Sequence, residues 1–222
     1  MRDGQVTNEA EEAAAFAAVP CLAALVETIL RLLPFDVAAA VSILELGAGS
    51  GILATALLAR FPHARLTVLE ESAELRAAAA RRLAKDAGRV EARDASFARD
   101  ELPRPFDAAV SMLRLHAIDD IARRGVYRGI YGALVPGGHL FIADHARAPT
   151  PGVHALYARV APMARPPRGL LLANELPWLA NIGFRDVDIH YKNLDYAVYG
   201  GRRPVASDFN FRRADGEEPE RR

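Results

Sequence analysis

The sequence has a single cysteine, Cys21, so no disulfide can form within the chain, and we expect a reducing, cytoplasmic compartment. It also lacks an excess of charge: 28 basic residues balance 28 acidic ones. No broad electrostatic attraction to nucleic acid or to an anionic membrane is therefore expected. A membrane-spanning helix needs about 20 apolar residues in a row, and Pro20, Glu27 and Arg31 interrupt the apolar stretch from Ala13 to Leu33. We expect no membrane segment and no metal site.

The chain of 222 residues is long enough for one sizeable core, and 51% apolar with 25% charged residues is an ordinary globular balance. Apolar residues recur at helical spacing between Leu22 and Leu33, which predicts an amphipathic helix packed on the main domain. We therefore expect an N-terminal helical cap over residues 1–40, a main domain over 41–204, and a charged, disordered tail over 205–222.

Strand and helix patterns alternate along the main domain, which predicts βαβ units and a parallel sheet. The expected strands cover 41–46, 65–69, 90–93, 106–111 and 140–143, and the expected helices cover 52–60, 72–87, 119–134, 153–160 and 174–182. Two last strands, Phe184–Tyr191 and Asp195–Gly200, flank a short turn at residues 192–194 and predict an antiparallel hairpin. Residues 145–173 are proline-rich and show little regular period beyond the short expected helix, so we expect a loop there.

The stretch from Val41 to Ile52 combines a buried strand, a glycine turn and a helix start. Such a turn presents free backbone N–H groups, and Gly47, Gly49 and Gly51 allow a ligand to approach the backbone closely. The dinucleotide pattern G-x-G-x-x-G is not met, because its third glycine position falls on Ile52. A carboxylate inside the strand, Glu45, would repel a phosphate and attract an ammonium or sulfonium group.

The pattern Glu45-x-Gly47-x-Gly49-x-Gly51 resembles the first motif of the class I S-adenosylmethionine-dependent methyltransferases of the small-molecule type. The resemblance covers roughly residues 20–204. It implies an α/β, Rossmann-like, seven-stranded sheet that is mostly parallel, ends in an antiparallel C-terminal hairpin and carries helices on both faces. It also implies S-adenosyl-L-methionine as the cofactor, bound by these four residues.

Ligands of open α/β sheets bind at the carboxyl ends of the strands, and further polar residues lie at such ends here. The resemblance implies that Glu70 binds the ribose hydroxyls and that Asp94 accepts from the adenine amino group. A backbone N–H near Ala95 and the ring of Phe97 would complete the adenine contacts. After the fourth strand, Ser111 and Met112 would face the methionine part of the cofactor.

Two histidines are candidates for a general base that takes a proton from a substrate hydroxyl: His116 after the fourth strand and His145 after the fifth. Arg114 and Arg147 could bind a substrate carboxylate in bidentate fashion. Methyl transfer mainly requires alignment of the reacting atoms and exclusion of water, so a base is not obligatory.

The leading interpretation is a methyltransferase for a small-molecule acceptor, in which the N-terminal helix and residues 145–173 cover the cofactor cleft and the substrate. A nucleic-acid methyltransferase is less favoured, because no Asn-Pro-Pro-aromatic or Asp-Pro-Pro-aromatic tetrapeptide follows the fourth strand and the net charge is not positive. A non-catalytic, regulatory cofactor-binding protein stays open, because residues 145–173 are short for a substrate lid. An NAD(P) oxidoreductase is a poor third. The sequence leaves open the acceptor, the atom that is methylated and the oligomeric state, a homodimer included.

Overall fold

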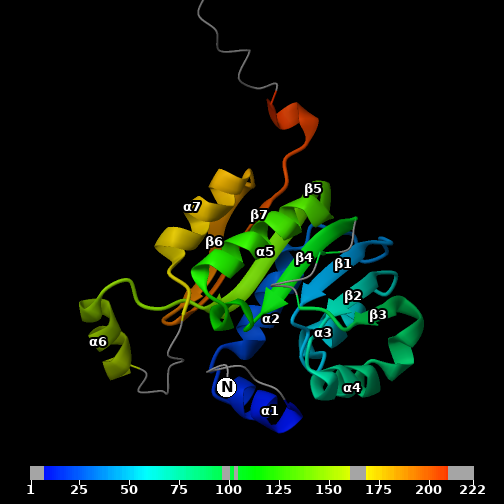
Figure 1. Cartoon of the computed structure of the whole chain (residues 1–222), viewed down its shortest axis with the longest axis horizontal. Helices are drawn as coiled ribbons and strands as arrows, with labels where there is room; N and C mark the ends of the chain where they lie inside the picture. Colours follow the sequence, from blue (N-terminus) through cyan, green and yellow to red (C-terminus); the bar gives the residue numbers. More distant parts are fainter. Residues whose placement is uncertain (1–7, 97–100, 103–104, 161–168, 210–222) are drawn as a thin grey trace, which may run out of the picture.

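The computed structural model describes residues 8–96, 101–102, 105–160 and 169–209. Its centre is a seven-stranded sheet in the order β3-β2-β1-β4-β5-β7-β6 (Figure 1). The first five strands run parallel, and β7 pairs antiparallel with both β5 and β6. This confirms the Rossmann-like sheet and its C-terminal hairpin. The strands are β1 (Ser42–Leu46), β2 (Arg65–Leu69), β3 (Val90–Arg93), β4 (Phe106–Met112), β5 (Leu134–His145), β6 (Arg185–Asn193) and β7 (Tyr196–Arg202).

Helices cover both faces of the sheet, and β1 shows why. Successive side chains of a strand point to opposite faces, and Ile43 packs in one apolar core whereas Leu44 packs in the other. The first core also takes side chains of α2 and α3, and the second takes side chains of α5 and α7. The α-helices are α1 (Glu9–Ala17), α2 (Leu22–Leu32), α3 (Ile52–Arg60), α4 (Ala73–Arg82), α5 (Asp120–Ala133), α6 (Pro151–Val160) and α7 (Leu172–Ile182).

Three short 3-10 helices complete the described elements: η1 (Ala84–Arg89), η2 (Leu115–Ala117) and η3 (Ala206–Phe209). The first of them corrects the expected helix over 72–87, because α4 ends at Arg82 and a 3-10 turn follows. The third lies where we expected the disordered tail, and Arg202 fixes it through Asp208 at 2.8 Å. Residues 210–222 of that tail lie outside the described residues.

Two expected turns are placed differently in the structure. The Pro136-Gly137-Gly138 stretch, which falls between the expected helix 119–134 and the expected strand 140–143, is not a turn but lies within β5, which starts at Leu134. Gly137 has φ +87°, and its N–H donates to the Arg203 carbonyl, so the stretch stays tied to the segment that follows β7. In the hairpin, β6 continues through Asn193 and the turn falls on residues 194–195, where Leu194 has φ +48°.

Two helices are attached to the sheet by little apolar contact. The only buried residue of α1 is Glu12, and α6 has none. Figure 1 shows α6 standing apart from the sheet and α1 lying below the arrowheads of β1 and β4. No single helix in the described ranges has the length and apolar character of a membrane span, although α1 and α2, bent by 93° at their junction, meet that test when they are taken together.

Candidate functional site

The glycine turn after β1 has the backbone conformation that its glycines make possible. Gly47, Gly49 and Gly51 have φ values of +66°, +58° and +83°, in the left-handed region that side chains disfavour. The N–H groups of Gly47 and Ala48 donate to the Leu69 carbonyl at 2.9 and 3.1 Å, which fixes the turn against the end of β2. The turn therefore lies at the carboxyl ends of β1 and β2.

Side chains of the protein fill the space directly above this turn. A Cβ atom built on Gly49 would lie 1.8 Å from Glu12 Oε1 and 2.4 Å from Arg114 Nη2. One built on Gly47 would lie 2.5 Å from Arg114 Cγ. The space that a missing Cβ leaves for a ligand is thus taken by an acidic and a basic side chain.

Glu70 lies at the glycine turn, where the ribose acid was expected. Its Oε2 accepts the Gly49 N–H at 2.9 Å, and its Oε1 accepts the Ser72 N–H at 3.0 Å. The side chain is 6% exposed. The position suits a carboxylate that receives ribose hydroxyls, and that role stays a prediction.

Glu45 is a buried acid whose Oε2 has no hydrogen-bond partner among the described residues. Burial raises the pKa of its carboxyl to about 8; nearby Arg114 opposes this rise, and the charges of Glu12 and Glu70 add to it. A buried polar atom without a partner is costly and calls for an explanation. A cationic ligand above the turn would supply the missing partner.

Arg114 does not project toward a separate substrate pocket but lies over the glycine turn. Its Nε donates to the Gly47 carbonyl at 3.0 Å, and its Nη2 lies 2.9 Å from Glu12 Oε1 and 3.5 Å from Glu70 Oε2. The preceding Leu113 has φ +56°, an uncommon conformation for leucine, and it turns the chain at the end of β4. Arg114 therefore lies at the turn expected to bind the cofactor. Its predicted role in binding a substrate carboxylate stays a prediction.

Glu12 was not a candidate from the sequence, yet it is a central residue of this site. Both of its carboxylate oxygens accept the Ser50 N–H, at 3.1 and 3.0 Å. The sequence of α1, rich in glutamate and alanine, is typical of a solvated helix and gave no signal for this contact. We call Glu12, Glu45, Glu70 and Arg114 the glycine-turn cluster.

The other residues expected to bind the cofactor lie outside the glycine-turn cluster. Asp94 directly follows β3; its side chain is 72% exposed, and its Oδ2 lies 3.0 Å from Arg76 Nη2. Ala95 is half-buried beside it, and Phe97 lies outside the described residues. Ser111 donates its hydroxyl to the Leu46 carbonyl at 2.9 Å, and Met112 is buried in the core. The Ser111 hydroxyl hydrogen is thus used to join β4 to β1.

His116 and Asp144 form a pair at the carboxyl ends of β4 and β5. His116 Nδ1 lies 2.6 Å from Asp144 Oδ1, and the carboxyl group also accepts the backbone N–H groups of Leu115, His116 and His145. Burial opposes ionisation of Asp144, but the His116 ring and the His145 N–H outweigh it and lower the pKa of the carboxyl. A carboxylate that accepts from Nδ1–H leaves the lone pair of neutral His116 on Nε2.

His145 is packed behind this pair. Its ring centroid lies 5.0 Å from that of His116 and 4.5 Å from that of Tyr196. Burial lowers the pKa of His145 to about 4, so the ring is neutral near pH 7. Its Nδ1 is buried and has no partner in the described part of the chain. Arg147, the other expected substrate residue, is exposed, and its N–H donates to the Leu170 carbonyl at 2.9 Å.

A second buried ionic group connects α5, α7 and β7, and we call it the helix cluster: Arg123, Tyr127, Glu175 and Tyr199. Arg123 contacts both oxygens of Glu175 at 2.8–3.2 Å, and the Tyr127 hydroxyl donates to Glu175 at 2.5 Å. Burial opposes the charge of Arg123, but Glu175 outweighs it and raises the pKa of the guanidinium.

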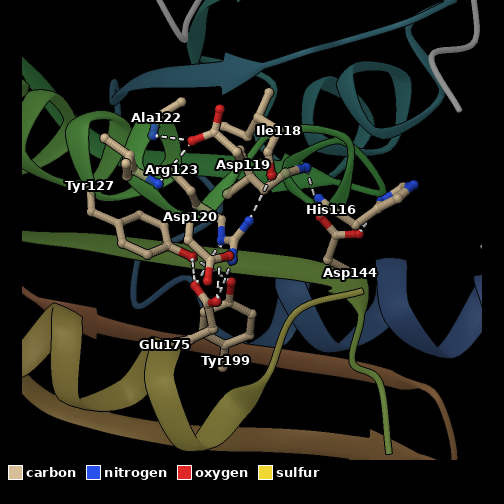
Figure 2. A network of polar contacts seen from close by, with 12 residues as sticks. His116, Ile118, Asp119, Asp120, Ala122, Arg123, Tyr127, Asp144, Glu175 and Tyr199 are labelled. Carbon is tan, nitrogen blue, oxygen red and sulfur yellow. Dashed lines mark hydrogen bonds and ion pairs between the residues drawn. The ribbon is translucent and has the colours of Figure 1, made fainter. Parts of the chain in front are cut away.

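Figure 2 shows how this cluster reaches the His116 pair. Arg123 Nη1 donates to the Ile118 carbonyl at 2.8 Å, directly after the η2 turn that carries His116. Asp144 holds the other side of that turn through its backbone N–H groups. His116 was predicted from the sequence, whereas Asp144 was not among the predicted site residues. The buried position of Asp144 at the end of β5 identifies it as the orienting carboxylate.

Two further observations concern alternative ligands. In the part of the chain that the structure describes, no three His, Cys, Asp or Glu side chains gather to hold a metal ion. Arg202, one of the basic residues near the C-terminus, is paired with Asp186 and Asp208, and Arg203 donates to the carbonyls of Gly132 and Leu134. These two arginines tie the end of β7 to the domain.

The residues above the glycine turn fit S-adenosylmethionine. The cofactor carries an ammonium and a sulfonium group, which suit the unpartnered Glu45 oxygen, and ribose hydroxyls, which suit Glu70. Close approach to Gly47 and Gly49 requires that the side chains of Glu12 or Arg114, which lie against these glycines, move aside.

Comparison with known proteins agrees with this geometry. Residues 43–138 match a family model described as a methyltransferase domain. No functionally curated protein matches the sequence.

Several solved structures share the fold. The apo form of the S-adenosylmethionine-dependent methyltransferase SibL is 23% identical with a TM-score of 0.64, over 86% of this chain and 62% of that chain. Human N-acetylserotonin methyltransferase in complex with SAM is 20% identical with a TM-score of 0.61, over 81% and 52%. An O-methyltransferase family protein from Burkholderia thailandensis is 20% identical with a TM-score of 0.65, over 93% and 66%.

The chain thus spans about half to two thirds of the length of these proteins. The matched segment, 43–138, contains the glycine turn, Glu70 and His116. The seven-stranded sheet with its antiparallel hairpin has the same arrangement as the fold of these enzymes. Residues 43–138 thus match a methyltransferase domain, and the described chain has the fold of these S-adenosylmethionine-dependent methyltransferases.

Proposed function

We propose that the protein transfers a methyl group from S-adenosylmethionine to a hydroxyl of a small-molecule acceptor, with His116 as the general base. The observation that carries this proposal is the His116–Asp144 pair, 2.6 Å apart, at the same sheet edge as the glycine turn. The neighbouring structures described as O-methyltransferases support an oxygen acceptor.

The bound cofactor supplies a methyl group on a sulfonium, which is already an activated leaving group. Glu70 and the glycine turn position it, and Asp144 keeps the Nδ1–H of His116 directed inward. His116 Nε2 would take the proton of the acceptor hydroxyl, while the cofactor would supply the methyl group to that oxygen and its sulfur would keep the electron pair of the broken S–CH₃ bond. The products are a methyl ether, the neutral demethylated cofactor and a protonated His116.

A test of the base compares His116→Ala with the unchanged chain in a screen of phenolic and other hydroxylated acceptors. The methyl-transfer rate should fall by about 10²–10⁴-fold, the usual contribution of a general base. The affinity for S-adenosylhomocysteine, measured by calorimetry, should change less than about twofold. Equal losses of rate and affinity would show that His116 is structural.

A matched variant, His145→Gln, separates the two histidines. We expect a smaller loss of rate, because the His145 ring is neutral and packed behind His116. If His145→Gln abolished turnover while His116→Ala did not, the base would be assigned to the wrong histidine.

A non-catalytic cofactor-binding protein is the second candidate. It is favoured by α6, which has no buried residue in the segment expected to cover the substrate. Binding of S-adenosylmethionine without turnover of any hydroxylated, amine or thiol acceptor would support it. Binding of NAD in place of S-adenosylmethionine would contradict both candidates.

A further inference from the structure

Three backbone groups of the glycine turn face the position of a ligand, and each already has a partner within the protein. The Gly47 carbonyl accepts from Arg114 Nε at 3.0 Å, and the Gly49 N–H donates to Glu70 at 2.9 Å. The Ser50 N–H donates to Glu12 at 3.0 and 3.1 Å. A ligand can use this turn only by displacing at least one of these side chains.

Glu12 has the surroundings of a bound carboxylate ligand. It receives a backbone N–H at the start of α3 and an arginine Nη2 at 2.9 Å, and its side chain is 3% exposed. Backbone N–H groups at a helix start together with an arginine are a typical anion site. The amino-acid end of S-adenosylmethionine offers the same group, a carboxylate.

We propose that Glu12 is a built-in stand-in for the carboxylate of the cofactor, and that cofactor binding displaces it and releases α1 from the glycine turn. Arg114 stays at the turn and exchanges the carboxylate of Glu12 for that of the ligand. This inference rests on the cofactor of the proposed function and is independent of the acceptor and of His116.

The attachment of α1 suits such an exchange. Glu12 is the only buried residue of α1, and the helix contacts the apolar core mainly through the half-buried Phe16. An ion pair also links α1 to α4. Glu9 lies 2.9 Å from Arg81, and the two side chains are 48% and 67% exposed. Exposed ion pairs add little stability, and helices with few buried apolar contacts open readily. Release of α1 therefore uncovers little apolar surface.

The charges above the turn favour the exchange as well. Three acidic side chains, Glu12, Glu45 and Glu70, surround one guanidinium, and one Glu45 oxygen has no partner in the described chain. Departure of Glu12 removes one of the three acids. The arriving ligand brings an ammonium and a sulfonium that can face the two acids that remain.

The two partners of the Glu12–Arg114 pair give opposite results in a binding experiment. Titration calorimetry with S-adenosylhomocysteine, which keeps the amino-acid end, should show about tenfold tighter binding to Glu12→Gln because the competitor is weakened. Arg114→Gln should bind at least about tenfold more weakly because the ligand loses its carboxylate partner. A pair with only a structural role would shift the affinity in the same direction in both variants.

Two controls assign the effect to the carboxylate. Methylthioadenosine lacks the amino-acid end, so its affinity should differ less than about twofold between the unchanged chain and Glu12→Gln. Glu9→Gln breaks the exposed ion pair of the same helix and should alter S-adenosylhomocysteine binding less than about twofold. A tenfold gain for methylthioadenosine would show that Glu12 blocks the site sterically and would overturn the proposal.

Hydrogen exchange gives a readout that does not depend on a variant. S-adenosylhomocysteine should speed exchange of the backbone N–H groups of residues 9–17 while slowing that of residues 47–52. Added protection of α1 would overturn the proposal, and so would weaker or unchanged binding to Glu12→Gln.

These outcomes separate the inference from the proposed function. Absence of S-adenosylhomocysteine binding to every variant would overturn both. Normal binding with the expected signs but without methyl transfer would overturn the proposed function alone.

Discussion

The glycine-turn cluster and the helix cluster are both buried and both contain one arginine, but they differ in their balance of charge. In the helix cluster Arg123 faces the buried carboxylate of Glu175 and the exposed one of Asp120, and both oxygens of Glu175 accept hydrogen bonds. In the glycine-turn cluster Arg114 faces three acids, and one Glu45 oxygen has no partner in the described chain. A closed set of partners stabilises a fold, whereas a set short of one cation is suited to a cationic ligand.

Breaking the helix cluster should give the largest change in stability. Arg123→Met keeps much of the side-chain volume but leaves the buried Glu175 without its cation. Removal of one partner of a buried pair costs about 3–5 kcal/mol. Urea unfolding should show this loss in the free energy of unfolding, and S-adenosylhomocysteine affinity should stay within about threefold when it is measured well below the unfolding midpoint. A loss below about 1 kcal/mol would contradict the claim that the helix cluster stabilises the fold.

Breaking the glycine-turn cluster at Glu70 should affect the ligand first. Glu70→Ala removes the carboxylate expected to hold the ribose, and we expect a loss of about 1.5–3 kcal/mol in the free energy of S-adenosylhomocysteine binding. The neighbouring Glu71→Ala is the matched control and should change it by less than about 0.5 kcal/mol. Weaker binding to Glu71→Ala alone would place the ribose acid one residue later.

The pH dependence of stability should sharpen the comparison. Burial raises the pKa of Glu175 in the helix cluster as well, so a Glu45 variant is needed to isolate the contribution of the glycine-turn cluster. Burial raises the pKa of Glu45 from 4.5 to about 8. The folded chain therefore holds a proton that the unfolded chain releases, so this contribution is full below pH 4.5 and is lost as the pH rises toward about 8.

The slope approaches about 1.4 kcal/mol per pH unit for one proton. Urea unfolding between pH 5 and 8 should show stability falling more steeply in the unchanged chain than in Glu45→Gln. Parallel pH profiles of the two proteins would contradict the buried, protonated state of Glu45.

The smallest expected effect lies at the edge of the helix cluster. Tyr199→Phe removes a hydroxyl that lies 2.7 Å from the Tyr127 hydroxyl, and one hydrogen bond contributes about 0.5–1.5 kcal/mol. Tyr131→Phe is the matched control, and we expect a change below about 0.5 kcal/mol. Thermal unfolding of both variants measures the difference. A larger loss for Tyr131→Phe would show that the cluster is not closed as described.

Much of the fold followed from local patterns. The buried strand 65–69 and the exposed strand 90–93 were both predicted with their observed bounds, because each is followed directly by polar residues. Parallel strands end at one sheet edge, so the topology also indicated that Glu70 and His116 belong to one site.

Other contacts could not be predicted, because they join segments far apart in the sequence. Glu12 and Arg114 are separated by 102 positions, and neither neighbourhood signals the other. The predicted start of β5 was wrong, because Pro136 and the two glycines after it are typical of a turn. In the structure Leu134 pairs with Phe106, and the register of the two strands shifts after this pair. Pairing across the sheet decided this element against its local signal.

The four hydrogen bonds that Asp144 accepts have a consequence for the order of events in turnover. The Asp144 side chain has no exposed surface, and these four donors already occupy its carboxylate. In the proposed reaction, a proton taken up at Nε2 of His116 is therefore not passed on through Asp144. It must leave through the face by which it entered, after the methylated product has vacated that face. Release of the product and deprotonation of His116 would then be coupled, and product release would limit the rate of each cycle.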